Sequence, residues 1–178
     1  MAMGDRIHYM GGEILLRTPW ERLTLADAFE RHASMPLQNA LEHRCFSELL
    51  VREVEPFLGL NRPAFVYDYP VALASLARVK QGDSRVVERF ELYLGGMEVA
   101  NGFSELADAN EQRARFEEEL SRRRKQGKEV YPMPERFLKA LSKMPEAAGI
   151  ALGVDRLTML FCNKEKIDDV VCFTPEEI

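Results

Sequence analysis

The sequence predicts an α+β fold in which an antiparallel sheet is flanked by helices. Two glycine pairs, Gly11-Gly12 and Gly95-Gly96, each stand between short runs rich in strand-forming residues. Such pairs are typical of β-hairpins, because glycine takes positive φ without steric cost. Stretches with helical spacing are interleaved with these hairpins, and this order favours α+β over a parallel, doubly wound fold.

The composition is that of an ordinary globular domain. The 178 residues are 46% hydrophobic and 30% charged, and the formal net charge is -5. A negative net charge argues against a protein that binds the phosphate backbone of nucleic acid mainly through its overall charge. The three cysteines form no C-x-x-C pair, and no run approaches the ~20 apolar residues of a membrane span. We therefore expect a single domain in the reducing cytoplasm, with no membrane association and no disulfide.

The elements can be assigned from local patterns. Thr24 and Asp27 have the spacing of a capping box, which predicts a helix that runs to about His32. An amphipathic stripe predicts one long helix over 37–57. Strands are expected at 6–10, 13–17, 65–67, 86–94, 97–103, 148–152 and 167–173, and helices at 108–125, 135–142 and 154–162.

The first segment that carries chemistry follows the second glycine pair. Glu98 and Glu105 are carboxylates that could hold a metal ion or an ammonium group. They are seven residues apart, so a regular strand directs them to opposite faces, and Gly102 would have to bend the strand to bring them together. Solvated charges at a strand edge are the alternative, and spacing alone favours it.

The second segment, 149–157, joins a strand to a helix through glycine and places Arg156 in the first helical turn. Backbone N–H groups and a guanidinium at such a position suit phosphate oxygens. The pattern G-x-x-x-x-G-K-[ST] is absent, which argues against a Walker-type nucleotide site. The alternative is that Asp155 and Arg156 pair with each other and cap a buried helix.

These two segments resemble a known family. Gly149-Ile-Ala-Leu-Gly-Val-Asp-Arg-Leu157 resembles motif 3 of class II aminoacyl-tRNA synthetases, and Glu98-Val-Ala-Asn-Gly-Phe-Ser-Glu-Leu106 is similar to the preceding strand of lysyl-tRNA synthetases. The resemblance extends over nearly the whole chain, so we expect residues 1–178 to be the C-terminal part of a class II catalytic domain. Supporting matches are at 19–24, 65–70, 88–92 and 107–116.

The resemblance implies ATP-dependent activation of a lysine-like amino acid as its adenylate, on a six- or seven-stranded antiparallel sheet. It assigns catalytic roles to Arg156 and Glu98. It further assigns ATP contacts to Glu98, Val99, Gly153 and Arg156, Mg²⁺ to Glu98 and more weakly to Glu91, and the amino-acid substrate to Asn101, Glu105 and Ala151, with Glu105 on its ammonium group.

One position separates subfamilies. Lysyl-tRNA synthetases usually have glycine where this chain has Ala151, whereas the ligases that modify elongation factor P resemble it in having alanine. One methyl group is worth only about 1 kcal/mol, enough to favour a β-amino acid but not to exclude α-lysine. The segment 69–77 and the lack of an anticodon-binding domain also resemble these ligases. The implied reaction is ligation of (R)-β-lysine to a lysine of elongation factor P, with tRNA a less expected partner.

The chain also departs from the family pattern. Motifs 1 and 2 are absent from this sequence; in the family, motif 2 supplies an arginine for the α-phosphate and carboxylate, and motif 1 builds the dimer interface. The family pattern leads us to expect a homodimer, although motif 1, which builds the usual dimer interface, is absent from this sequence. An inactive fragment, a lysyl-tRNA synthetase fragment that charges tRNA, and a non-catalytic paralogue that binds nucleotide or a partner remain alternatives. The basic run 122–128 is interpreted as a solvated helix end rather than a binding patch.

Overall fold

The computed structural model describes residues 4–174, and the contacts within the chain divide it into two compact units. Unit 1 takes the described residues up to Tyr69, then Arg89–Gly102, and the described residues from Ile150 onward. Unit 2 takes Pro70–Glu88 and Phe103–Gly149. That residues 1–178 form the C-terminal part of a single catalytic domain stays a prediction.

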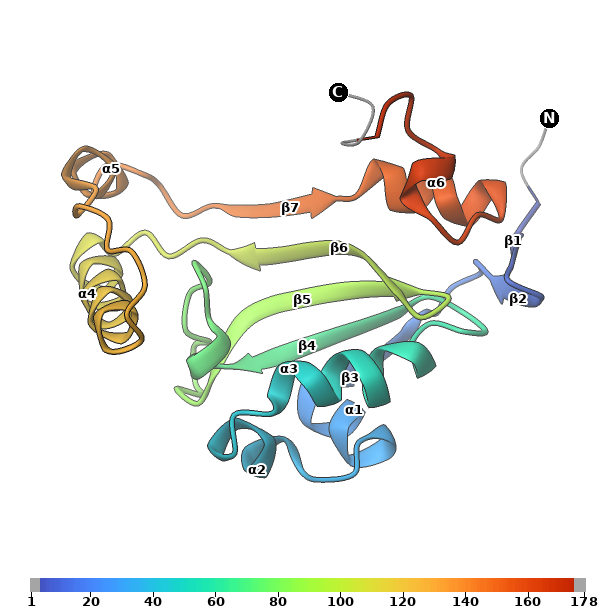
Figure 1. Ribbon diagram of the computed structural model, residues 1–178, viewed down its shortest axis with the longest axis horizontal. Coiled ribbons are helices and arrows are strands. Elements are labelled where there is room, and N and C mark those ends of the chain that lie inside the picture. The colour runs from blue at the N-terminus through green and yellow to red at the C-terminus, as the bar shows by residue number, and fades with distance from the viewer. Residues whose placement is uncertain (1–3, 175–178) are drawn as a thin grey trace. The chain divides into compact units, whose positions relative to one another are not determined.

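The predicted α+β class is confirmed, with a multi-stranded sheet and flanking helices (Figure 1). The main sheet has the strand order β3-β4-β5-β6-β7, and β1 and β2 form a separate two-stranded sheet. The strands are β1 Arg6–Tyr9, β2 Gly12–Leu15, β3 Glu21–Thr24, β4 Ala64–Pro70, β5 Val86–Leu94, β6 Met97–Ser104 and β7 Ala148–Leu152.

The main sheet differs from the expected one in two respects. Among the described residues it has five strands rather than six or seven, and β3 pairs with β4 in parallel, with Glu21 opposite Ala64 and Thr24 opposite Tyr67. The parallel pair has a topological cause. The chain leaves the end of β3, passes through a helical crossover, and returns to begin β4 beside the start of β3.

The first hairpin is present, but its turn is displaced by one residue from the predicted glycine pair. Tyr9 lies opposite Gly12, so Met10 and Gly11 form the turn, with φ of 47° and 79°. Met10 is an unusual residue for this conformation. Its N–H donates to Oδ1 of Asn163 at 2.7 Å, which fixes the turn against the end of a later helix.

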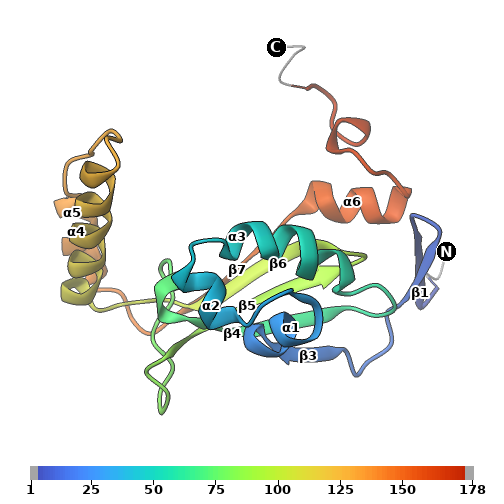
Figure 2. The same cartoon turned by 60° about the horizontal axis from the view of Figure 1, so that its bottom comes forward.

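The crossover is helical, yet it is not the single helix predicted over 37–57. Helix α1 (Leu25–His32) begins at the predicted capping box. Arg44 then has a φ of 60°, and this left-handed residue interrupts the helix although the apolar spacing continues through it. The crossover continues as α2 Leu37–Glu42, α3 Phe46–Leu49, the π-helical η1 Leu50–Val54 and the 3₁₀ turn η2 Glu55–Phe57. Figures 1 and 2 show α1–α3 along one side of the sheet.

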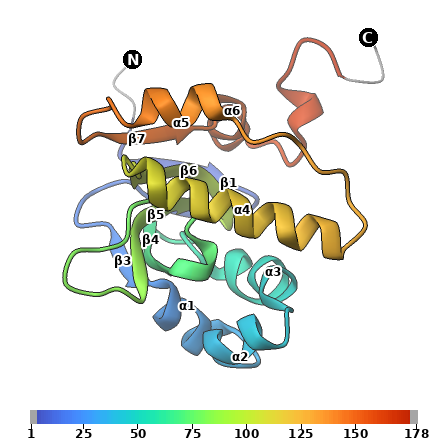
Figure 3. The same cartoon turned by 90° about the vertical axis from the view of Figure 1, so that its left-hand side faces the viewer.

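Unit 2 contains a pair of helices, α4 (Ala109–Lys125) and α5 (Glu135–Leu141), which lie side by side in Figures 1 and 3. Phe116 and Phe137 pack with ring centroids 6.0 Å apart, and Arg113 donates two hydrogen bonds to Glu135. The bounds of both helices agree with the prediction within a residue. The four basic residues of the last turn of α4 are placed where they complement the helix dipole.

Strand β7 and helix α6 (Val154–Cys162) also have the predicted bounds. The strand predicted over 167–173 is wrong, because the structure has a 3₁₀ turn, η4 (Ile167–Asp169), in the described part of this segment. The N–H of Val170 donates back to the carbonyl of Ile167, and this turn curls the backbone away from an extended conformation.

Gly59 offers a direct test of the packing beneath the sheet. Its φ is 70°, and a Cβ built there would lie 2.3 Å from the carbonyl oxygen of Tyr93. Gly59→Ala should therefore lower the free energy of unfolding by about 3 kcal/mol or more, as left-handed strain adds to overpacking. Urea unfolding followed by circular dichroism measures this loss.

The matched control is Gly11→Ala. Gly11 also has positive φ, but a Cβ there would meet nothing within 4 Å. Only the conformational penalty of about 1 kcal/mol should appear. Equal losses in the two variants would contradict the close approach of Gly59 to β5.

Candidate nucleotide and amino-acid site

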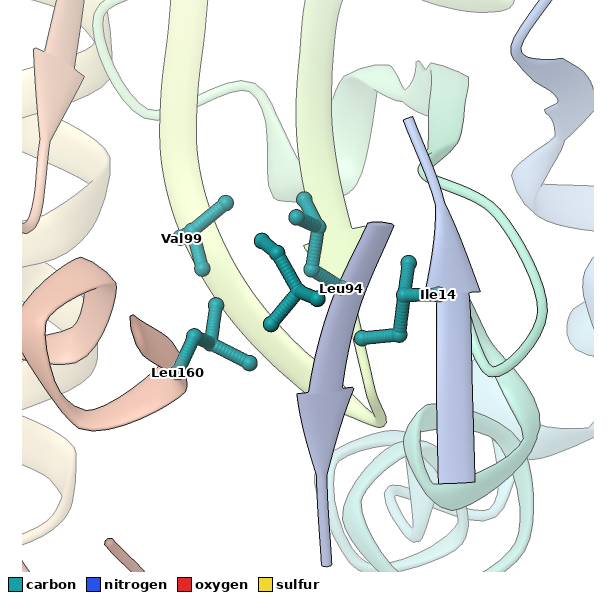
Figure 4. Packing of buried hydrophobic residues seen from close by; sticks show 5 residues of the cluster. Ile14, Leu94, Val99 and Leu160 are labelled. Carbon is teal, nitrogen blue, oxygen red and sulfur yellow. The ribbon is translucent and has the colours of Figure 1, made fainter. Parts of the chain in front are cut away.

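Helix α6 is positioned by the core of unit 1. Leu160 is fully buried in a cluster with residues of the β1–β2 hairpin and of strands β5 and β6, which are Ile7, Ile14, Leu94 and Val99 (Figure 4). Leu160 lies four residues after Arg156, so both side chains project from the same side of the helix. Burial of Leu160 therefore holds Arg156 over β6.

Arg156 and Glu98 form the centre of the candidate site. Nη1 of Arg156 donates to the backbone carbonyl of Glu98 at 2.8 Å and to its Oε2 at 3.1 Å. Beside them, the N–H of Gly153 donates to the carbonyl of Val99 at 2.9 Å. These contacts bring together four residues that the sequence assigned to nucleotide binding. Arg156 pairs with Glu98 and not with Asp155, which answers the alternative of a simple helix cap.

The pair faces solvent and retains binding capacity. The Arg156 side chain is 49% exposed, and its remaining guanidinium N–H groups donate to no described residue. A guanidinium has five N–H donors in a planar fork that matches phosphate oxygens. No side chain caps α6 at Gly153, so the free N–H groups of its first turn add to this positive end. The arrangement can bind an anion.

A second cluster lies on strands β4, β5 and β6, around the buried carboxylate of Glu91. Its Oε2 accepts hydrogen bonds from Tyr69 at 2.6 Å and from Tyr93 at 2.7 Å. Its Oε1 accepts from Arg89 at 2.5 Å and from Asn101 at 3.1 Å. The donors come from β4, β5 and β6, so one carboxylate ties three adjacent strands.

Arg89 completes the cluster. Its Nε donates to Oδ1 of Asn101 at 3.3 Å, and its guanidinium lies 4.4 Å from the centroid of the Tyr69 ring. Burial and the negative charge of Glu91 raise the pKa values of Tyr69 and Tyr93, so both hydroxyls remain hydrogen-bond donors throughout the physiological range. The negative charge of Glu91 is thus offset by the guanidinium of Arg89, and each carboxylate oxygen of Glu91 accepts two hydrogen bonds.

Glu55 connects this cluster to the crossover helices. Its Oε1 lies 3.3 Å from the hydroxyl of Tyr93, which is closer to Glu91. Burial is the main cause that raises the pKa of Glu55; the Tyr93 hydrogen bond opposes it, while the charges of Glu91 and Glu98 add to it. The carboxyl group of Glu55 therefore takes up its proton at a higher pH than an ordinary glutamate does.

The carboxylates differ in their capacity for Mg²⁺. Magnesium is usually held by one or two carboxylates together with substrate phosphates and water. Glu98 fits this use, because only one of its oxygens is engaged by Arg156. Glu91 already accepts four hydrogen bonds, so it would have to release a donor to bind metal. Across residues 4–174 no three His, Cys, Asp or Glu side chains are grouped as a metal site.

The remaining predicted residues are placed separately. Ala151 is exposed on β7 in unit 1. Glu105 belongs to unit 2, where its N–H donates to the carbonyl of Ala147 and its carboxylate lies 3.1 Å from the position of a Cβ on Gly149. The convergence of Glu105 with Glu98 stays a prediction.

Sequence reasoning missed most of the buried cluster. Tyr69, Tyr93, Arg89 and Glu55 carried no assigned role, although Glu91 and Asn101 did. Arg89, Glu91 and Tyr93 alternate along β5, and Glu91 and Tyr93 are buried. Three titratable or hydroxyl-bearing residues at alternate positions of one strand were the signal for a buried network.

Comparison with known proteins places the chain in a family. It matches the family described as class II tRNA synthetases (D, K and N) over residues 3–177, and it belongs to this family. It is also similar to three curated proteins that are each named elongation factor P--(R)-beta-lysine ligase. The identity is 52% over 126 residues for Proteus mirabilis, 46% over 154 for Haemophilus influenzae strain PittGG and 42% over 179 for Pectobacterium carotovorum.

These alignments cover 70%, 86% and 88% of this chain, but 39%, 48% and 55% of the respective relatives. The chain therefore spans about half the length, or less, of the curated relatives it matches. Separately, the helices of residues 4–174 include none with the length and apolar character that crossing a membrane requires.

The raised pKa of Glu55 predicts a pH effect. Between the ordinary glutamate pKa of ~4.3 and the raised value, the folded chain binds more protons than the unfolded chain, so the free energy of unfolding falls as pH rises through this window. Glu55→Gln keeps an acceptor for Tyr93 and removes the ionisation. It should be more stable than the parent at pH 7, with the advantage lost at about pH 4.

Urea unfolding at the two pH values tests this expectation. Glu48→Gln is the control, because Glu48 is an exposed glutamate on the neighbouring helix α3, paired with Arg52. A Glu55→Gln variant that is less stable than the parent at pH 7 would show that the carboxylate is needed in its charged form.

Proposed function

We propose that this chain takes part in the ATP-dependent activation of a lysine-like amino acid as its adenylate, and in its transfer to a lysine of elongation factor P. The observation that carries the proposal is the Arg156–Glu98 pair at the open start of α6. It is supported by family membership and by the 42–52% identity to the relatives named above.

The reaction needs positioning and charge neutralisation rather than a nucleophilic side chain. An oxygen of the amino-acid carboxylate bonds to the α-phosphorus of ATP, and the bond to pyrophosphate breaks. The lysine amine of the acceptor protein then attacks the activated carbonyl, and AMP leaves with the bonding electrons. Arg156 would neutralise phosphate oxygens, and Glu98 would hold Mg²⁺ against them.

The substrate side of the proposal comes from the resemblance. Glu105 would pair with the ammonium group of the amino acid, and Ala151 would favour (R)-β-lysine over α-lysine through one methyl group. The Nδ2 group of Asn101 donates one hydrogen bond to Glu91, and its Oδ1 accepts one from Arg89. An amide NH₂ group has two N–H donors, so the second one would be available to a substrate. Its contribution would be a fixed orientation at the strand.

ATP–pyrophosphate exchange tests the adenylation step. The 178-residue chain should be assayed alone and together with the unaligned part of the Pectobacterium relative, with (R)-β-lysine, α-lysine or no amino acid. We expect exchange to depend on (R)-β-lysine in at least one of the two preparations, and Arg156→Ala to lower it about 10²- to 10³-fold, as for other lost transition-state donors.

Arg52→Ala is the matched control, because Arg52 is an exposed arginine that pairs with Glu48, one helical turn away. It should leave the exchange rate unchanged. Mass spectrometry of elongation factor P then reports whether the amino acid is transferred. Exchange supported by α-lysine alone, with charging of tRNA, would contradict the proposal, as would a lack of exchange in both preparations.

A further inference from the structure

Glu105 lies opposite a short segment of backbone, 75–77, that is not part of a regular strand. Ala77 and Glu105 form an isolated antiparallel bridge within unit 2. Two backbone hydrogen bonds flank it, from the N–H of Arg78 to Ser104 at 2.8 Å and from the N–H of Leu106 to Leu76 at 2.9 Å. Directly opposed residues of such a pair share a face, so the methyl group of Ala77 lies beside the Glu105 side chain.

The backbone of segment 75–77 needs support from outside this bridge. Ser75 has a φ of 51°, in the left-handed region that residues other than glycine rarely adopt. Ala77 is fully buried, and its place in the bridge directs its carbonyl away from Glu105. A buried carbonyl without a partner costs free energy, so this group requires a donor from another element.

Arg115 of helix α4 supplies that donor. Its Nη1 donates to the carbonyl of Ser75 at 3.1 Å and to the carbonyl of Ala77 at 2.9 Å. Its Nη2 donates to the carboxylate of Glu111, one helical turn earlier. Because Nη1 carries two N–H groups in the plane of the guanidinium, one side chain holds both carbonyls in a fixed direction. The Arg115 side chain is only 19% exposed, so its surroundings restrict its movement.

The support that Arg115 gives to Ala77 extends to Glu105. Glu105 directly follows the last residue of β6, and two backbone contacts hold it there. Its N–H donates to the carbonyl of Ala147 at 2.9 Å, and the bridge to Ala77 lies on its other side. The first contact is a single hydrogen bond, and the second depends on segment 75–77. The position of the Glu105 carboxylate therefore depends on Arg115.

We propose that Arg115 is a positioning residue for the amino-acid substrate, because it holds segment 75–77 and thereby sets where the Glu105 carboxylate meets the substrate ammonium group. The inference deepens the proposed function and rests on it. A binding group has to be held within roughly 0.5 Å of its productive position. Loss of Arg115 should therefore weaken amino-acid binding. Arg156 and Glu98 belong to unit 1, so ATP binding should be unaffected.

Hydrogen exchange of the 178-residue chain tests the structural part of this inference. In Arg115→Ala the amides of Arg78 and Leu106, which donate across the bridge, should exchange about tenfold faster or more, because the bridge opens locally. Arg115→Lys keeps a cation that can reach one carbonyl and should show a smaller increase. Arg113→Ala is the matched control: Arg113 lies on the same helix and pairs with Glu135, so both amides should exchange as in the parent.

ATP–pyrophosphate exchange tests the substrate part, in whichever of the two preparations described above is active. Arg115→Ala should raise KM for (R)-β-lysine about tenfold, while kcat and KM for ATP stay within about twofold of the parent. Arg115→Lys should recover part of the loss, and Arg113→Ala should leave all three constants unchanged. A general loss of folding would instead change both KM values, so this split separates positioning from stability.

Three results would overturn the proposal. They are unchanged exchange of both amides in Arg115→Ala, an unchanged KM for (R)-β-lysine in that variant, and equal rises in KM for (R)-β-lysine and for ATP. A parent without pyrophosphate exchange would contradict the proposed function and with it the substrate role. The exchange rates of the two amides would then still decide whether Arg115 holds Glu105 in place.

Discussion

The carboxylate of Glu91 is the constraint on which the centre of the structure depends. It is 6% exposed, and a negative charge at such a depth is tolerated only when hydrogen bonds and a positive charge replace water. Tyr69, Arg89, Tyr93 and Asn101 provide these replacements from three adjacent strands. The register of β4, β5 and β6 is consequently fixed by a polar contact as well as by apolar packing.

The solvent-facing pair of Arg156 and Glu98 depends on the register of these strands. Glu98 and Val99 precede Asn101 on β6, so the strand that Asn101 holds in place also presents the backbone groups that Arg156 and Gly153 contact. Leu160 fixes the other side through the core. Unit 1 thus separates two tasks: a saturated, buried charge sets the geometry, and a partly exposed ion pair retains the capacity to bind phosphate.

The sequence predicted those features that depend on neighbours along the chain. The capping box at Thr24 and the bounds of β5, β7 and α6 all follow from local patterns. The motif around Arg156 also pointed to Glu98, Val99, Gly153 and Arg156, which the structure brings together. Features that depend on residues far apart in the sequence could not be predicted from local patterns.

The break at Arg44 leaves the apolar spacing intact, so periodicity could not reveal it. The parallel pairing of β3 depends on the path of the whole crossover. The turn at 167–169 replaced a predicted strand because apolar composition does not by itself provide a pairing partner. Tyr69 is 22 residues from Glu91, and only folding shows that it donates to it.

Glu91→Gln is the most direct test of the claim that the buried carboxylate organises strands β4, β5 and β6. The variant removes the buried negative charge that Arg89 contacts, and the free energy of unfolding in urea should fall by about 3–5 kcal/mol. The control variant is Glu88→Gln, which removes the carboxylate on β5 that pairs with Arg78. This ion pair is partly exposed, so its loss should cost about 1 kcal/mol or less. A larger loss for Glu91→Gln is the predicted result, and equal losses would contradict the account.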